Sequence, residues 1–236
     1  MINMIPKIIH YVWVGGNPKP KNIQRCMKTW RKHLKDYKII EWNENNFDIH
    51  ENKYVEEAYK AKKWAFVSDY IRAKAVYEYG GIYLDTDVLV LDNLEELLDN
   101  AAFVGFENKD NPFTSVFGAQ KHHPLLKDML DYYEDRDFEF NKNDQLAGVN
   151  TVSVSDILKN KYHAQPNNHE QILQTGIHIY PDGVLCNPSP NSKTIHVFTG
   201  TWMEGEKPLK RKIVTALKVR IKTKREAALY AKYIRS

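Results

Sequence analysis

The sequence predicts an α/β fold built on a largely parallel sheet. Short apolar runs alternate with segments of helical periodicity along most of the chain, as expected for such a sheet. The 236 residues are 42% hydrophobic and 12% aromatic, which provides for a substantial core and excludes a disordered chain. No stretch approaches the length of uncharged apolar residues that a membrane-spanning helix needs.

Each expected element has a local reason. An apolar run closed by Gly15-Gly16 is typical of a buried strand that enters a loop. Asn93 is expected to cap a short helix and Ser153 a later one, with Asp156 completing its first turn. We expect strands over residues 8–14, 37–42, 82–91, 101–106, 113–119, 177–180 and 194–198, and helices over residues 20–35, 52–63, 64–79, 124–133 and from 153 onward. Ligands of such sheets bind beyond the carboxyl ends of the strands.

Charge divides the chain into an acidic body and a basic tail. Residues 207–236 hold 11 Lys and Arg and one acid, a net charge of +10. Because the whole chain carries +4, residues 1–206 carry −6. We therefore expect a globular domain over 1–206 and a basic amphipathic helical tail over 207–236, able to bind an anionic membrane surface. The alternative is a terminal helix packed on the body, and nucleic acid is not an expected partner because the tail has few aromatic residues.

Cysteine usage and the N-terminus predict the compartment. Cys26 and Cys186 are too few to staple a chain of this size, so a reduced compartment is expected. They also exclude a zinc site built mainly on thiolates. The first residues lack the basic region and cleavage site of a signal peptide. We expect a cytoplasmic protein, peripheral at the inner face of the plasma membrane if its tail binds lipid.

Two carboxylates interrupt an apolar strand candidate. In the run GGIYLDTDVL, Asp85 and Asp87 are expected on one face of the strand, with Tyr83 behind them, because side chains alternate. Two buried carboxylates repel each other, and desolvating each costs several kcal/mol as an order of magnitude. A bound cation offsets this cost. Mg²⁺ and Mn²⁺ prefer oxygen ligands and leave places for phosphate oxygens. The pair predicts a metal that holds a diphosphate; the alternative is a surface turn with two solvated aspartates.

The helix before this strand carries a second charged pair. Asp69 and Arg72 are three residues apart and therefore neighbours on one helix face. On a surface such a pair contributes only about 0.3–0.5 kcal/mol. Facing a site, Asp69 could accept hydrogen bonds from sugar hydroxyls, and Arg72 could donate to phosphate or sugar oxygens. The spacing alone leaves both interpretations open.

Three segments, taken together and in this order, resemble a known group of enzymes. They are IPKIIHYVWVGG, FVSDYIRAKAVYEYGGIYLDTDV and IHVFTGTW, and they span about residues 5–202. The chain thereby resembles the DXD-containing glycosyltransferases, which include bacterial capsular polysaccharide transferases and yeast initiating mannosyltransferases, with the clostridial glucosylating toxins as distant relatives. The resemblance implies a GT-A fold, which is a Rossmann-like nucleotide-sugar-binding α/β fold, and Mn²⁺ or Mg²⁺ as cofactor. It further implies a retaining hexosyltransferase that uses a nucleotide-sugar donor, with UDP favoured, and a saccharide or lipid-linked saccharide acceptor in bacterial surface polysaccharide synthesis.

The resemblance also implies residues that bind the donor. Trp13 would stack on the donor base from the loop after the first strand. Asp69 and Arg72 would bind the donor sugar, and Tyr83 would line the same pocket. Arg72 would in addition act in catalysis, together with the metal, by neutralising the leaving diphosphate.

The remaining implied residues bind the metal and complete the site. Asp87 would ligate the metal directly, and Asp85 would contact ribose and sugar or reach the metal through water, both as catalytic residues. His196 would be a metal or phosphate ligand, although a lone His in a strand is more often part of the core. Thr201 stands where the group often has Ser, and Trp202 would touch the diphosphate or the sugar.

The chain departs from the group in two places. An Asn expected in the middle strand region is replaced near Thr114 or Ser115, and a Gly-Pro element is missing around residues 148–153. Acceptor recognition therefore does not transfer from the group. A double displacement needs a carboxylate nucleophile at the anomeric carbon, and the sequence identifies none. We therefore favour attack by the acceptor hydroxyl on the same face from which the leaving group departs. His10 is expected to be a core or supporting histidine.

Two other functions compete with glycosyl transfer. A haloacid-dehalogenase-like phosphatase also begins with Asp-x-Asp after apolar residues, and would use Asp85 as nucleophile and Asp87 as acid or base. That motif usually lies near the N-terminus and is followed by a further acidic pair, which this sequence lacks. A non-catalytic module that binds through its basic tail would leave the acidic pair unexplained.

Overall fold

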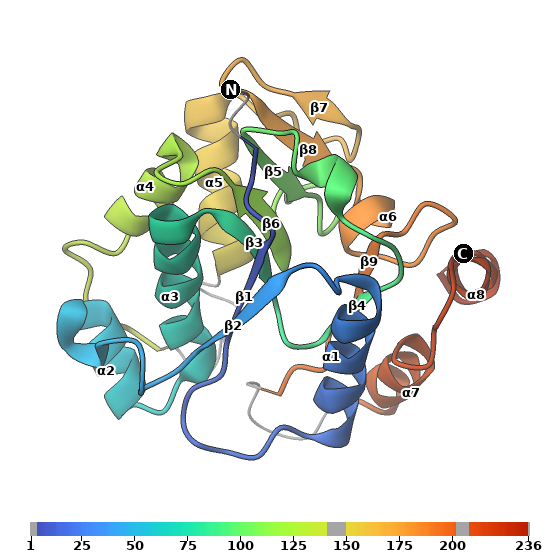
Figure 1. Cartoon of the computed structure of the whole chain (residues 1–236), viewed down its shortest axis with the longest axis horizontal. Helices are drawn as coiled ribbons and strands as arrows, with labels where there is room; N and C mark the ends of the chain where they lie inside the picture. The colour runs from blue at the N-terminus through green and yellow to red at the C-terminus, as the bar shows by residue number, and fades with distance from the viewer. Residues whose placement is uncertain (1–3, 141–149, 202–207, 236) are drawn as a thin grey trace.

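The computed structural model describes residues 4–140, 150–201 and 208–235 (Figure 1). Within these ranges a seven-stranded sheet forms the centre, in the order β2-β1-β3-β6-β5-β8-β7. Five strands are parallel to one another, while β6 and β7 run against them. The strands of this sheet are β1 (Ile8–Val12), β2 (Lys38–Trp42), β3 (Gly81–Leu84), β5 (Ala102–Gly105), β6 (Val116–Ala119), β7 (Gln171–Ile172) and β8 (Ile177–Tyr180). The largely parallel α/β fold is thereby confirmed.

Helices lie on both sides of this sheet, and a second sheet of two antiparallel strands, β4 (Val88–Val90) and β9 (Thr194–His196), lies beside it (Figure 1). The helix α3 packs against β1, β3 and β6, whereas α1 packs against β4. The α-helices are α1 (Lys21–His33), α2 (Lys53–Lys60), α3 (Trp64–Tyr79), α4 (Pro124–Asp131), α5 (Asn150–Tyr162), α6 (Asp182–Leu185), α7 (Leu209–Lys218) and α8 (Lys224–Tyr230). Two 3-10 turns, Ile49–Glu51 and Glu95–Leu97, and a π-helical turn, Ala231–Arg235, complete the described elements.

The buried helix α3 sets the position of the strand that follows it. Most of its residues from Phe66 to Val76 are buried, because the sheet and the helices α2 and α4 surround it. Gly80 ends the helix with φ of 63°, and Gly81 has φ of 115°. A Cβ atom on Gly81 would come within 2.7 Å of the backbone oxygen of Ile8. The Gly-Gly pair therefore lets β3 pair closely with β1 directly after the helix.

Two sequence expectations need correction. The strand expected over residues 82–91 divides into two, because the chain leaves the large sheet after Leu84. The backbone amide of Val88 donates to the backbone oxygen of Asp85 (3.0 Å), which closes a turn. Asp85 and Asp87 thus lie in a turn between two sheets and not on one strand face. Ser153 does not cap a helix, because α5 already begins at Asn150 and the Ser153 hydroxyl donates to the Asn150 backbone oxygen (3.2 Å).

The basic tail forms two helices that contact the small sheet. Ile221, Ala227 and Tyr230 are buried with Leu89 and Ile195 in a separate apolar cluster. Thr223 caps α8 by accepting from the amide of Glu226 (3.2 Å). The division at residue 207 remains a prediction, although α8 shares this cluster with the body. None of the described helices has the length and apolar character needed to cross a membrane.

Candidate functional site

The candidate site lies where parallel strands end. Trp13 follows β1, Asp85 follows β3, and Glu107 comes shortly after β5. Because these three strands are parallel, their carboxyl ends meet at one edge of the sheet. The first half of α3 lies at the same edge and contributes Asp69 and Arg72.

A buried group of charged and hydroxyl side chains surrounds Arg72. Its Nη2 atom lies 3.0 Å from Asp69 Oδ1 and 3.2 Å from Asp85 Oδ1. The Tyr83 hydroxyl donates to Asp85 Oδ1 (3.0 Å), and the guanidinium carbon lies 4.7 Å from the Tyr83 ring centroid. Ser68 accepts from the guanidinium (3.2 Å). The structure therefore brings Asp69, Arg72, Tyr83 and Asp85 together, and their roles in binding a donor remain predictions.

The second aspartate of the pair is held by the late segment. Asp87 Oδ2 accepts from the amide (2.7 Å) and the hydroxyl (3.0 Å) of Thr199. Asp87 Oδ1 lies 3.2 Å from Nε2 of His196. The pairing of β4 with β9 places Val88 opposite His196 and so brings the late segment to the turn.

These contacts shift the proton affinities of the charged groups. Burial opposes ionisation of Asp87, but His196 and Thr199 outweigh burial and hold the pKa of Asp87 well below its usual value. Burial also opposes a charge on His196, whereas Asp87 raises the pKa of His196 well above its usual value. Burial raises the pKa of Asp69 despite the opposing charge of Arg72. The Asp87–His196 pair is thus a salt bridge when no cation binds it.

Asp85, Asp87 and His196 could together hold a divalent cation. Each offers a ligand atom, and these atoms lie within 4.8 Å of one another. The two carboxylates suit Mn²⁺ or Mg²⁺, the additional imidazole favours Mn²⁺ over Mg²⁺, and further positions stay open to ligands. His196 must give up its ring proton to bind a metal, because only the neutral imidazole has a free electron pair. The donor set therefore fits the predicted metal site.

Of the other predicted residues, Trp13 and Thr201 do not join these contacts among the described residues. The Trp13 indole is half-buried and donates to the Asn17 backbone oxygen (2.7 Å), and Lys19 lies 5.3 Å from its ring centroid. Thr201 is exposed in the loop that follows Thr199. Trp202 lies outside the described residues, so its expected contact with the donor remains a prediction.

Sequence reasoning missed three residues of this site. Thr199 holds Asp87 from 112 positions away in the sequence, and no local pattern signals such a contact. Ser68 is one residue before Asp69, on the buried helix. Glu107 is half-buried, and Thr151 donates to its Oε2 atom (3.4 Å); burial raises the pKa of Glu107. Glu107 comes directly after the expected strand over residues 101–106, and that position could have identified it.

Several buried polar atoms have no hydrogen-bond partner among the described residues. Within residues 4–140, 150–201 and 208–235, Thr114 Oγ1, Ser115 Oγ and Asn150 Oδ1 make no hydrogen bond, although each residue is at most 4% exposed. The backbone oxygen of Ser115 accepts from the backbone amide of Asp85 (3.0 Å). The backbone amide of Asn150 donates to the carboxylate of Asp69. An unpaired buried polar atom costs about 1–3 kcal/mol. Ser115 and Asn150 are thus tied to Asp85 and Asp69 through their backbones and carry side-chain oxygens that no described residue pairs.

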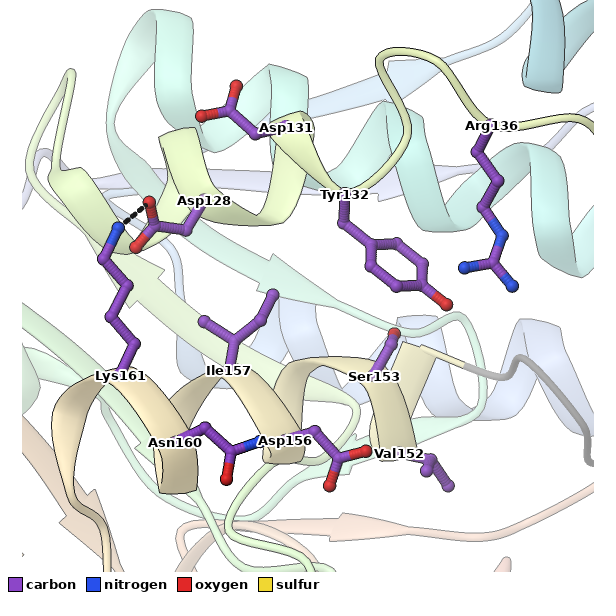
Figure 2. A pocket seen from close by; sticks show the side chains of 10 residues that line it. All are labelled: Asp128, Asp131, Tyr132, Arg136, Val152, Ser153, Asp156, Ile157, Asn160 and Lys161. Carbon is purple, nitrogen blue, oxygen red and sulfur yellow. Dashed lines mark hydrogen bonds and ion pairs between the residues drawn. The ribbon is translucent and has the colours of Figure 1, made fainter.

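A cleft of about 630 Å³ lies between α4 and α5, and Figure 2 shows its lining. Asp128 and Lys161 form an ion pair across it (2.5 Å), and the Arg136 guanidinium lies 4.5 Å from the Tyr132 ring centroid. The lining includes no residue of the Asp85, Asp87 and His196 cluster. We therefore treat the cleft as separate from the candidate metal site.

Comparisons with known proteins agree with this geometry. Residues 20–104 match the family described as the glycosyltransferase sugar-binding region containing the DXD motif. The chain is 30% identical over 136 residues to an uncharacterized glycosyltransferase of Acanthamoeba polyphaga mimivirus, covering 52% of this chain and 53% of that protein. It is 29% identical over 130 residues to inositol phosphoceramide mannosyltransferase 3 of Schizosaccharomyces pombe, covering 52% of this chain and 35% of that one. The chain thus spans about half of the first relative and about a third of the second.

A solved structure supports the fold. The PaToxG glycosyltransferase aligns with a TM-score of 0.50 at 18% sequence identity, covering 67% of this chain and 70% of that chain. This likeness concerns the arrangement of the backbone, which is that of the GT-A glycosyltransferases. The expected GT-A fold is thereby confirmed.

Proposed function

We propose that this chain, whose residues 20–104 match the DXD-motif glycosyltransferase family, transfers a sugar from a nucleotide-sugar donor, preferably a UDP-sugar, to a hydroxyl group of a saccharide acceptor. The observation that carries the proposal is the convergence of Asp85, Asp87 and His196 at the edge of the sheet where ligands of such folds bind. The buried hydroxyl and amide atoms near Asp85 and Asp69 support a ligand rich in hydroxyls. A role in bacterial surface polysaccharide synthesis rests on the sequence resemblance alone.

Asp85, Asp87 and His196 would hold Mn²⁺ or Mg²⁺, which when bound offsets the negative charge of the leaving diphosphate. Thr199 fixes the carboxylate of Asp87 through two hydrogen bonds, so this ligand is held in place before the donor binds. The permanent charge of Arg72 is buried between Asp69 and Asp85. From there it can donate to sugar or phosphate oxygens as the bond to the anomeric carbon breaks.

We further propose retention of anomeric configuration by attack on the face from which the diphosphate departs. In this scheme the departing phosphate oxygen takes the proton of the acceptor hydroxyl as the new glycosidic bond forms. The positive charge that develops on the sugar ring is oxocarbenium-like. Asp69 and Asp85 supply negative charge near the sugar, and no enzyme-bound sugar forms. A double displacement would instead require a carboxylate nucleophile beneath the anomeric carbon; Glu107 is a further carboxylate at this edge besides Asp69 and Asp85.

A donor-hydrolysis screen over UDP- and GDP-sugars with Mn²⁺ tests the proposal. We expect slow release of the free sugar from at least one donor without acceptor. Asp87→Asn, which can still accept from Thr199, should lower this rate at least about a hundredfold, because a metal ligand is lost. Asp99→Ala, at an exposed carboxylate, is the matched control and should keep the wild-type rate.

Two results would contradict the proposal. One is donor hydrolysis by Asp87→Asn at the wild-type rate, which would show that Asp87 is not a metal ligand in the reaction. The other is hydrolysis of an aryl phosphate by a protein that cleaves none of the nucleotide sugars, which would favour the phosphatase interpretation. Circular dichroism spectra of the variants establish that a lost rate is not a lost fold.

A further inference from the structure

The helix α7 turns three of its large apolar side chains away from the body. Leu209, Ile213 and Leu217 lie along one stripe of this helix, since they are four residues apart, and they are 72%, 52% and 38% exposed. We call this stripe the exposed ridge. A helix on a globular protein normally buries its apolar stripe against the core. In α7 that arrangement is reversed.

The opposite side of α7 faces the body mainly with polar and charged residues. Arg211 and Thr215 are partly covered, as is the apolar Val214, and Lys218 is buried. Lys218 Nζ donates to the backbone oxygen of His196 (3.2 Å) and lies 4.6 Å from the Phe198 ring centroid. These contacts orient α7, so the exposed ridge follows from packing and not from a free helix end. Figure 1 shows α7 and α8 at one side of the molecule, across from the layer that holds α2 and α3.

Positive charge surrounds the ridge. Exposed basic side chains occur on α7, on the connection to α8 and on α8 itself, namely Lys210, Lys212, Arg220, Lys222, Arg225 and Lys232. Glu226 is the one acid of the whole basic tail. A second exposed apolar group, Leu229, Tyr233 and Ile234, lies in α8 and the turn after it.

We propose that this face binds the surface of an anionic lipid bilayer. Aliphatic side chains flanked by Lys and Arg are the composition that inserts at the boundary of headgroups and acyl chains, while the cations pair with lipid phosphates. A second copy of the chain fits less well, because it would bring two strongly basic tails together. Nucleic acid fits less well too, because bases stack on aromatic rings and the ridge is aliphatic.

Cosedimentation of the full chain with lipid vesicles tests this proposal. We expect binding to phosphatidylcholine vesicles that contain about 30% phosphatidylglycerol, weak binding to phosphatidylcholine alone, and release at about 0.5 M salt. The double variant Ile213→Asn, Leu217→Asn removes the centre of the ridge without removing charge, and should weaken binding at least about tenfold. Lys210→Glu combined with Lys212→Glu should weaken it similarly on anionic vesicles.

The matched control is Ile172→Asn in β7, because Ile172 is 75% exposed and lies outside the tail. It should bind vesicles as the wild type does. The proposal would be overturned if the wild-type protein did not cosediment with anionic vesicles at low salt. It would also be overturned if the ridge variant bound them with unchanged affinity. Binding of a DNA duplex or RNA with no binding of vesicles would also overturn it. None of the altered side chains belongs to the metal-ligand cluster, so donor hydrolysis tests the proposed function separately.

Discussion

Asp85 and Asp87 have different surroundings although one residue separates them. Asp87 is held by Thr199 and His196, whereas Asp85 contacts Arg72 and Tyr83. The two carboxylates therefore contact different side chains. Their candidate metal-ligating atoms nevertheless lie within 4.8 Å of each other. The sequence motif predicts that the two aspartates act together. It does not predict their partners, because Thr199 and His196 reach the turn through strand pairing across most of the chain.

The unpaired hydroxyl of Ser115 gives a prediction at the scale of one residue. Ser115→Ala removes a buried hydroxyl that has no partner among the described residues, so the free energy of unfolding should stay the same or rise slightly. If the hydroxyl pairs with the donor sugar, affinity for the UDP-sugar should fall about five- to tenfold, while affinity for UDP should not change. Titration calorimetry with both ligands measures this difference. Equal affinities of the variant and the wild type for the UDP-sugar would show that Ser115 does not contact the sugar.

Single elements show how far local sequence signals reach. The bounds of α3 follow from a buried apolar segment and a Gly-Gly pair, and both were predicted. The short strand β7 was not predicted, because two residues carry no periodicity. The turn at Asp85 was expected only as the alternative, with both aspartates solvated, because an apolar run on both sides gives the same pattern as one continuous strand; in the structure the turn buries Asp87.

His10 links three elements and gives a prediction at this scale. It is fully buried on β1, its Nε2 atom lies 2.8 Å from the Gly80 oxygen after α3, and its Nδ1 atom accepts from the Trp42 indole on β2 (3.1 Å). It is therefore a core histidine, as expected. Burial lowers the pKa of His10 from 6.5 to about 4. Between pH 6.5 and pH 4, His10 is protonated in the unfolded chain but neutral in the folded chain. His10 therefore contributes to the free energy of unfolding above pH 6.5, and this contribution is lost as the pH falls to 4.

The loss amounts to about 3 kcal/mol in the free energy of unfolding between pH 7 and pH 4. His10→Gln can make similar hydrogen bonds but does not titrate. Urea unfolding at both pH values should therefore show a smaller decrease for the variant than for the wild type, by about that amount. Equal decreases would mean that His10 is protonated in the folded protein.

At the scale of the whole molecule, charge and topology act together. The sheet brings the ends of β1, β3 and β5 to one edge, and β9 carries His196 to the same place. The tail then packs on β9 through Lys218 and on the small sheet through Ile221 and Ala227. The charge division was visible in composition alone. The outward direction of the ridge on α7 was not, because helical spacing does not tell which face a neighbouring element covers.

Calorimetry of UDP binding with and without Mn²⁺ is the most direct test of the central claim, that Asp85, Asp87 and His196 hold a cation which binds the diphosphate. We predict UDP binding with Mn²⁺ that weakens at least about tenfold when EDTA replaces the metal, and no such metal dependence in Asp87→Asn. Equal UDP affinity of the wild-type protein in Mn²⁺ and in EDTA would contradict the claim.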